Sequence, residues 1–205
     1  MTRPMIVLSV AFTSMAGSAR AQRAAVQPAD ARTTSAANAA DSTTIKNRAA
    51  FLLFVEMERR TFIEAAQAMP ADKYGFAPHD GEFADVRTFS QQIRHLAATN
   101  YILAAAALGE RPPADAGDEQ GPDSVITKAQ HIAYLRGSYD ALERAARAIG
   151  DARIPVGSSP ISPFQGGSPT RIALITEALG HAYDHYGQMV VYLRMNGVVP
   201  PASRR

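Results

Sequence analysis

Apolar residues recur at three- and four-residue steps in four long segments of the chain, and no segment alternates apolar with polar residues. The first pattern consists of Phe51, Leu52, Val55, Phe62, Ile63 and Ala66. Such steps are the period of an amphipathic helix, whereas a half-buried strand has a period of two. We therefore predict four helices, over about residues 43–69, 88–108, 127–149 and 168–195, in an all-α four-helix bundle with long connecting loops.

Local signals place the ends of these helices. Thr88 with Gln91, and Thr127 with Gln130, have the spacing of a capping box, in which a hydroxyl and an amide bond each other's backbone donors. Gly109 is a typical helix stop. For the fourth helix, Ser168 is predicted as the N-cap because a proline follows it.

The first residues have the order of a secretory signal peptide. A charged start at Arg3 precedes an apolar run over residues 5–15, and Ala19, Arg20 and Ala21 form a small-x-small cleavage site. We expect cleavage after Ala21 and a periplasmic or secreted protein; the alternative is a disordered or interfacial N-terminus. The apolar run is too short for a stable membrane span.

The domain organisation follows from these boundaries. Residues 1–21 are the predicted signal peptide, and residues 22–42 lack apolar periodicity and are predicted to be a flexible linker. The bundle domain then covers residues 43–201.

Composition excludes several classes of protein. The chain has no cysteine, which rules out disulfides, thiolate metal sites and a cysteine nucleophile. Any metal site must therefore use histidine, carboxylate or water. The chain has no tryptophan, and loss of Arg3 and Arg20 with the signal peptide leaves equal numbers of basic and acidic residues. We therefore expect no nucleic-acid partner.

The five histidines carry the main chemical signal. His181 and His185 are four residues apart on the fourth predicted helix, so both project from one face and can share a metal ion. Such a pair also occurs by chance, and metal use needs a third donor, for which His95 on the second helix is the leading candidate. His79 lies in a turn and His131 in the first turn of the third helix, and we expect both to be solvated.

A site with three neutral histidines leaves a divalent ion its full charge and an open position, as in catalytic metal sites; a structural site is more often closed by a fourth protein ligand. Imidazole ligands suit zinc or nickel, which we place first, and also iron or copper. Glu177 and Gln188 flank the predicted histidine face and could orient an imidazole or bond a metal-bound water, although Glu177 could equally be a solvated helix residue. Tyr183 and Asp184 are expected to point away. The loop over residues 150–167 is long enough to be a lid or to flank a site.

Three motifs resemble a known family. They are residues 69–76 after the first helix, residues 88–96 with His95, and residues 181–188 with the order His-x-x-x-His-x-Gly-Gln. From about residue 45 to residue 201 the chain resembles the DinB-like (DinB/YfiT-like) metalloenzyme family. The resemblance implies a four-helix bundle, often a homodimer, with a metal held by His95, His181 and His185.

The resemblance also bears on activity. Members of the wider group include thiol-dependent transferases that use bacillithiol, mycothiol or glutathione, and a maleylpyruvate isomerase, while many have no assigned activity. Because those thiols are cytoplasmic, an exported member is expected to differ, and metal-dependent hydrolysis needs no such cofactor. We therefore expect a metal-dependent enzyme, of hydrolase or transferase type, with a small-molecule substrate. The alternatives are a non-catalytic periplasmic metal-binding or sensing protein, and a bundle whose histidines bind no metal.

Overall fold

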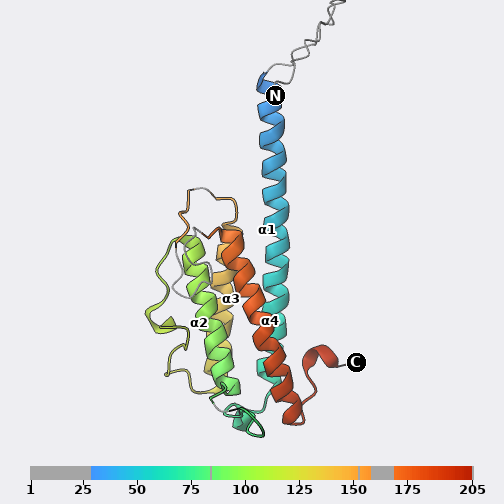
Figure 1. Cartoon of the computed structure of the whole chain (residues 1–205), viewed down its shortest axis with the longest axis vertical. Helices are drawn as coiled ribbons and strands as arrows, with labels where there is room; N and C mark the ends of the chain where they lie inside the picture. The colour runs from blue at the N-terminus through green and yellow to red at the C-terminus, as the bar shows by residue number, and fades with distance from the viewer. Residues whose placement is uncertain (1–28, 84, 152, 158–168, 205) are drawn as a thin grey trace, which may run out of the picture. The chain divides into compact units, whose positions relative to one another are not determined.

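The computed structural model describes residues 29–83, 85–151, 153–157 and 169–204. These residues contain four α-helices and no strand: α1 (Ala29–Ala68), α2 (Phe89–Leu108), α3 (Lys128–Arg147) and α4 (Arg171–Met195). Three short 3-10 helices, η1 (Ala71–Lys73), η2 (Ala114–Ala116) and η3 (Pro201–Ser203), lie in the connections and near the C-terminus. The predicted all-α fold is confirmed (Figure 1).

The chain divides into residues 1–37 and residues 38–205, and the second unit contains the bundle. Within it, α2, α3 and α4 run alongside one another, and α1 contributes its C-terminal half to the same core (Figure 1). The largest fully buried side chains come from all four helices and from the residue directly after α1, and they include Phe62, Met69, Ile93, Leu103, Leu135, Tyr139, Leu174 and Ile175. Burial of these apolar surfaces is the main favourable contribution to folding.

The helix ends follow the predicted signals with one shift. Thr88 and Thr127 each cap a helix through a complete capping box, and Gly109 ends α2 with a left-handed φ of 69°. For α4, however, the N-cap is Thr170, whose hydroxyl accepts from the Ala173 backbone nitrogen at 3.2 Å. The predicted cap Ser168 lies outside the described residues.

The start of α1 corrects the sequence prediction. The helix begins at Ala29 rather than near Thr43, so residues 29–42, predicted to be part of a linker, are helical. This segment is rich in alanine, the strongest helix former, but residues 33–43 are exposed. Apolar periodicity detects a helix through its buried face, and an exposed helix has none to detect. The division into signal peptide, linker and domain stays a prediction.

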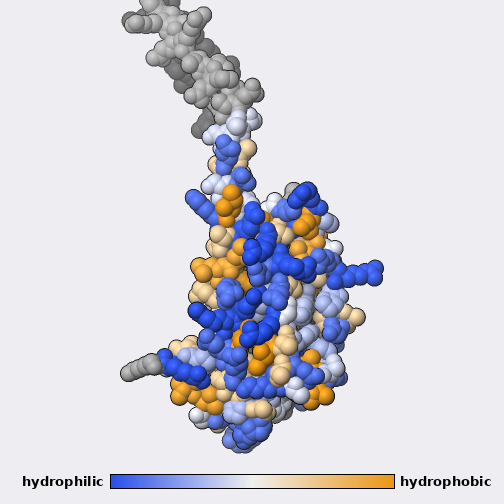
Figure 2. All heavy atoms as spheres, turned by 180° about the vertical axis from the view of Figure 1, so that it is seen from behind, coloured by the Kyte–Doolittle hydropathy of each residue, from blue (hydrophilic) through white to orange (hydrophobic). Residues whose placement is uncertain are grey.

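The described surface is mixed in character. No described helix is long and apolar enough to cross a membrane. The face in Figure 2 is largely hydrophilic, with apolar residues in separate patches. The homodimer expected from the resemblance stays a prediction.

One carboxyl group lies inside the bundle core. Glu58 on α1 has no exposed surface, and neither of its oxygens has a hydrogen-bond partner among the described residues. Burial raises the pKa of Glu58 to about 8, so the side chain is mainly protonated at neutral pH. Burial raises the pKa of the Tyr139 hydroxyl on α3, and charge on Glu58 would raise it further.

We predict that Glu58 makes the protein less stable as pH rises from 4.5 to about 8. Over this range the unfolded state releases the carboxyl proton while the folded state retains it, which costs about 1.4 kcal/mol per pH unit. Glu58→Gln removes this titration, so the variant should gain about 4 kcal/mol relative to wild type between pH 4.5 and pH 8. Urea unfolding at several pH values measures the difference. Glu64→Gln, an exposed change on the same helix, is the control, and a Glu58→Gln difference that is constant with pH would contradict the prediction.

Candidate metal centre

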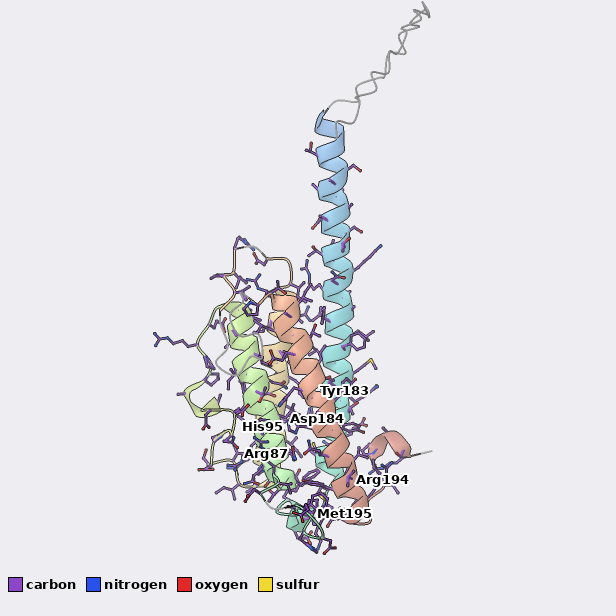
Figure 3. The ribbon with its side chains drawn as sticks, in the orientation of Figure 1. Arg87, His95, Tyr183, Asp184, Arg194 and Met195 are labelled. Carbon is purple, nitrogen blue, oxygen red and sulfur yellow. The ribbon has the colours of Figure 1, made fainter. Side chains whose placement is uncertain are left out.

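The structure brings three histidines together between α2 and α4. Nε2 of His181 lies 3.0 Å from Nε2 of His95 and 3.0 Å from Nε2 of His185. His95 and His185 are 4% and 5% exposed, and His181 is half-buried. The ring centroids lie 4.4–4.9 Å apart. Figure 3 labels His95 on α2 beside the strip where α2 and α4 meet.

Hydrogen bonds on the outer nitrogens orient two of the rings. Nδ1 of His95 lies 2.8 Å from the backbone carbonyl oxygen of Glu119, and Nδ1 of His185 lies 2.6 Å from Oε1 of Gln92. A carbonyl oxygen can only accept, so each Nδ1 carries the proton. In the neutral ring Nε2 then holds a free lone pair, which is the form that binds a metal.

The Glu119 carbonyl is held in place by an unusual backbone conformation. Glu119 has a φ of 78°, which is rare for a residue other than glycine and costs about 1–3 kcal/mol. The loop is tied to α2 by Arg94, whose Nη1 donates to the Pro122 carbonyl at 3.1 Å and contacts Asp123 at 2.8 Å. These contacts aim a backbone oxygen at His95.

A chain of amide and carboxylate contacts supports His185. Gln92 is 1% exposed, and its Nε2 donates to Oε1 of Gln188 at 2.7 Å, which leaves its Oε1 facing His185. Gln188 in turn donates from Nε2 to Oδ2 of Asp184 at 3.1 Å. The candidate Gln188 is therefore close to the histidines, and it reaches His185 through Gln92.

The other sequence candidates have mixed outcomes. Asp184 does not point away as expected: it lines a cavity together with His185 and Gln188, because it lies four residues before Gln188 at the edge of the same helix face. Tyr183 is 48% exposed, and its label in Figure 3 lies toward α1. Glu177 is half-buried and is not among the described residues that line this cavity.

The remaining two histidines are not part of the cluster. His79 is exposed beside Asp80, as predicted. The prediction for His131 is wrong, since it is 2% exposed. Its Nδ1 bonds the Thr127 carbonyl at 2.8 Å, and the ring of Tyr74, from the loop after α1, covers it at a centroid distance of 5.4 Å. The burial of His131 could not be predicted from the sequence, because a contact with a loop residue leaves no periodic pattern of apolar residues.

Burial keeps the three clustered histidines neutral. Desolvation, together with smaller contributions from the neighbouring imidazoles, lowers the pKa of His181 to about 4 and that of His185 to about 3. The pKa of His95 is lowered too, first by burial and then by the charge of Arg87. Three lone pairs therefore face one another, and the 3.0 Å spacing suits nitrogens about 2.0–2.1 Å from one shared ion. The residues fit a divalent metal ion.

A cavity of about 650 Å³ opens beside the cluster. Its described lining comes from the segment before α2, from α2, from the loop after it and from α4: Asp85, Val86, Arg87, Gln91, Gln92, Gln120, Asp184, His185 and Gln188. The lining is mostly polar, and His185 forms part of it. A small molecule in the cavity would reach the histidines.

Comparison with known proteins agrees with this geometry. A family model described as the DinB superfamily matches residues 55–189, which is more than half of the chain and includes all three clustered histidines. No curated protein gives a significant match. The chain belongs to the DinB superfamily, and it has a histidine triad positioned to bind a divalent metal.

Gln92 should control metal affinity without touching the metal. Gln92→Leu removes the acceptor of the His185 Nδ1 proton, and loss of such a support typically weakens binding about 10–100-fold. Titration calorimetry with Zn²⁺ measures the effect. Gln67→Leu, an exposed change on α1, is the matched control, and unchanged affinity in folded Gln92→Leu would refute the role.

Proposed function

We propose that this protein is a metal-dependent enzyme in which His95, His181 and His185 hold one divalent ion beside a small-molecule cavity. The observation that supports this most directly is the position of the triad: three neutral nitrogens converge at the wall of an open cavity. A closed structural site usually has a fourth protein ligand, whereas the cluster here has three among the residues that the structure describes. Zinc and nickel are the first choices of metal, with iron and copper as alternatives.

The bound ion would supply Lewis-acid chemistry, polarising an oxygen of the substrate or lowering the pKa of a water molecule. The protein residues have separate tasks. Gln92 and the Glu119 carbonyl hold the imidazole rings in their binding orientation. Gln188 positions the Asp184 carboxylate, which lines the cavity and can accept a proton there. Among the two sequence candidates, these contacts favour Gln188 over Glu177 in an assisting role.

Hydrolysis is our preferred reaction type, with thiol-type transfer as the alternative. We propose that the protein is exported, because residues 1–21 have the order of a signal peptide. Soluble cytoplasmic thiols would not be its co-substrates in that compartment, whereas hydrolysis requires water and the ion alone. The cavity and its carboxylate are compatible with this chemistry.

His181→Ala should abolish stoichiometric metal binding, because it leaves two donors at the site. Calorimetry with Zn²⁺ and with Ni²⁺, together with elemental analysis of the purified protein, measures this. His79→Ala removes an exposed histidine outside the cluster and should bind metal like wild type. Tight one-to-one binding by His181→Ala would refute the proposed site.

Access to the ion separates an enzyme from a non-catalytic metal-binding or sensing protein. Co²⁺-substituted protein should change its visible absorption when imidazole or a small thiol is added, because an open coordination position accepts the new ligand. An unchanged spectrum would indicate a site closed by another group and would favour the non-catalytic alternative.

Export predicts a defined mature N-terminus. When the full chain is expressed in a bacterium with a periplasm, the protein should be recovered from the periplasm. Its mass should be that of a chain that begins at Gln22. Ala21→Phe, which removes the small residue at the cleavage site, should retain the longer N-terminus. Cytoplasmic recovery of wild type with its first residues intact would contradict export.

A further inference from the structure

Arg87 is the one permanently charged cation among the described residues that line the cavity. Its Nε is buried and has no hydrogen-bond partner among the described groups, and none of the ion pairs between described residues includes Arg87. The charge acts on all three clustered histidines, since it lowers the pKa of each. A buried, unpaired guanidinium nitrogen is costly unless a ligand pairs with it.

The backbone places Arg87 firmly at this position. The residue directly precedes the N-cap Thr88 of α2, and its carbonyl oxygen accepts from the Tyr192 hydroxyl on α4 at 3.0 Å. Figure 3 labels Arg87 close to His95 in this view, with Asp184 of α4 nearby. Arg87 therefore lies at the start of α2, and it lines the same cavity as His185 of the triad.

A second cavity adjoins the first. It has a volume of about 420 Å³, and its described lining is mainly apolar: Pro78, Phe83, Val86, Val191, Tyr192 and Met195, together with Gln188. Val86 and Gln188 line both cavities. Phe83, Val191 and Met195 are each about half exposed, at 45%, 49% and 50%. An apolar cavity thus continues into the polar one that contains Arg87.

We propose that the substrate is a small carboxylic acid with an apolar tail, its carboxylate on Arg87 and its tail in the apolar cavity. The guanidinium offers the planar pair of donors that a carboxylate accepts. Asp85 and Asp184 line the same polar cavity and would repel a dianionic phosphate more than a monoanion. With a divalent ion on the triad, positive charge outweighs these two carboxylates, so an anion is attracted to the site. This inference rests on the proposed function and specifies its substrate class.

The two cavities have complementary tasks. The apolar cavity, of a size typical for small-molecule sites, supplies affinity through burial of the tail. Arg87 fixes the polar end beside the histidines and so sets the orientation. Recognition of both ends would place the reacting group of the substrate next to the ion.

Calorimetry on full-length protein, first metal-free and then with Zn²⁺ added, tests the inference with acetate, octanoate, 1-octanol and octyl phosphate as probes. The affinities given below are those expected with Zn²⁺ present, when positive charge outweighs Asp85 and Asp184 in the polar cavity. Octanoate should bind at least tenfold more tightly than acetate, because each buried methylene adds affinity, and at least tenfold more tightly than 1-octanol. Arg87→Gln should weaken octanoate at least tenfold and leave 1-octanol within twofold. Arg194→Gln, a change of the labelled arginine farther along α4 that lines neither cavity, should leave both unchanged.

The apolar end has its own pair of variants. Val191→Ser should weaken octanoate about fivefold and leave acetate unchanged, while Leu53→Ser, a similarly exposed apolar change on α1, should alter neither. Three results would each overturn the inference. Arg87→Gln and Arg194→Gln could change the octanoate affinity equally, octyl phosphate or 1-octanol could bind more tightly than octanoate, or all of the probes could fail to bind.

These binding experiments test the substrate class separately from the metal site. Zn²⁺ binding is measured on the same preparations. Protein that binds Zn²⁺ but not octanoate retains its metal site and refutes the substrate class. Protein that binds octanoate through Arg87 but not Zn²⁺ supports the binding site and refutes the metal-dependent reaction.

Discussion

The structure depends on one electrostatic constraint: three neutral imidazoles direct their Nε2 lone pairs toward a common point, with His181 3.0 Å from each of the other two. Protonation would relieve one contact at a time, but burial lowers the pKa of all three rings and opposes it. The rings cannot all turn freely, because Nδ1 of His95 and of His185 is bonded to an oxygen. A divalent cation, which these three nitrogens are placed to hold, would remove the repulsion between the lone pairs with the rings as they stand.

The bundle meets this constraint through matched spacing on two helices. On α2, Gln92 precedes His95 by three residues, and on α4, His185 precedes Gln188 by three. The two glutamines bond each other across the helices at 2.7 Å, so the same contact that holds α2 against α4 also orients a histidine. The rest of the support comes from a loop, where Glu119 adopts a left-handed conformation to present its carbonyl. Helix packing and ring orientation are therefore coupled.

Sequence patterns predict the parts of this arrangement that are carried by residue type and helical spacing. The three histidines, the capping threonines and Gln188 could be identified in that way, because each has a recognisable neighbour in the chain. The Glu119 carbonyl could not, since any residue has one, and its role depends on loop conformation. Gln92 and Arg87 could not be identified in this way, because their hydrogen-bond partners lie far away in the sequence. Gln92 bonds His185, 93 positions away, and the Arg87 carbonyl bonds Tyr192, 105 positions away. Burial of His131 under Tyr74 likewise depends on a loop that periodicity does not describe.

Glu58 and the histidine triad are both largely buried and both neutral, but they differ in their access to solvent. Glu58 lies in the core without a hydrogen-bond partner among the described residues, and it becomes neutral by keeping its proton. The triad becomes neutral by losing protons, and its rings have directed acceptors behind them and an open cavity beside them. The protonated Glu58 carboxyl has no exposed surface, so no ion or ligand can reach it from solvent. Neutral nitrogen donors at a cavity wall, close to an arginine whose Nε has no hydrogen-bond partner among the described groups, are the groups to which we assign an ion and an anionic ligand. The difference in access, rather than in burial, identifies the triad as the candidate functional site.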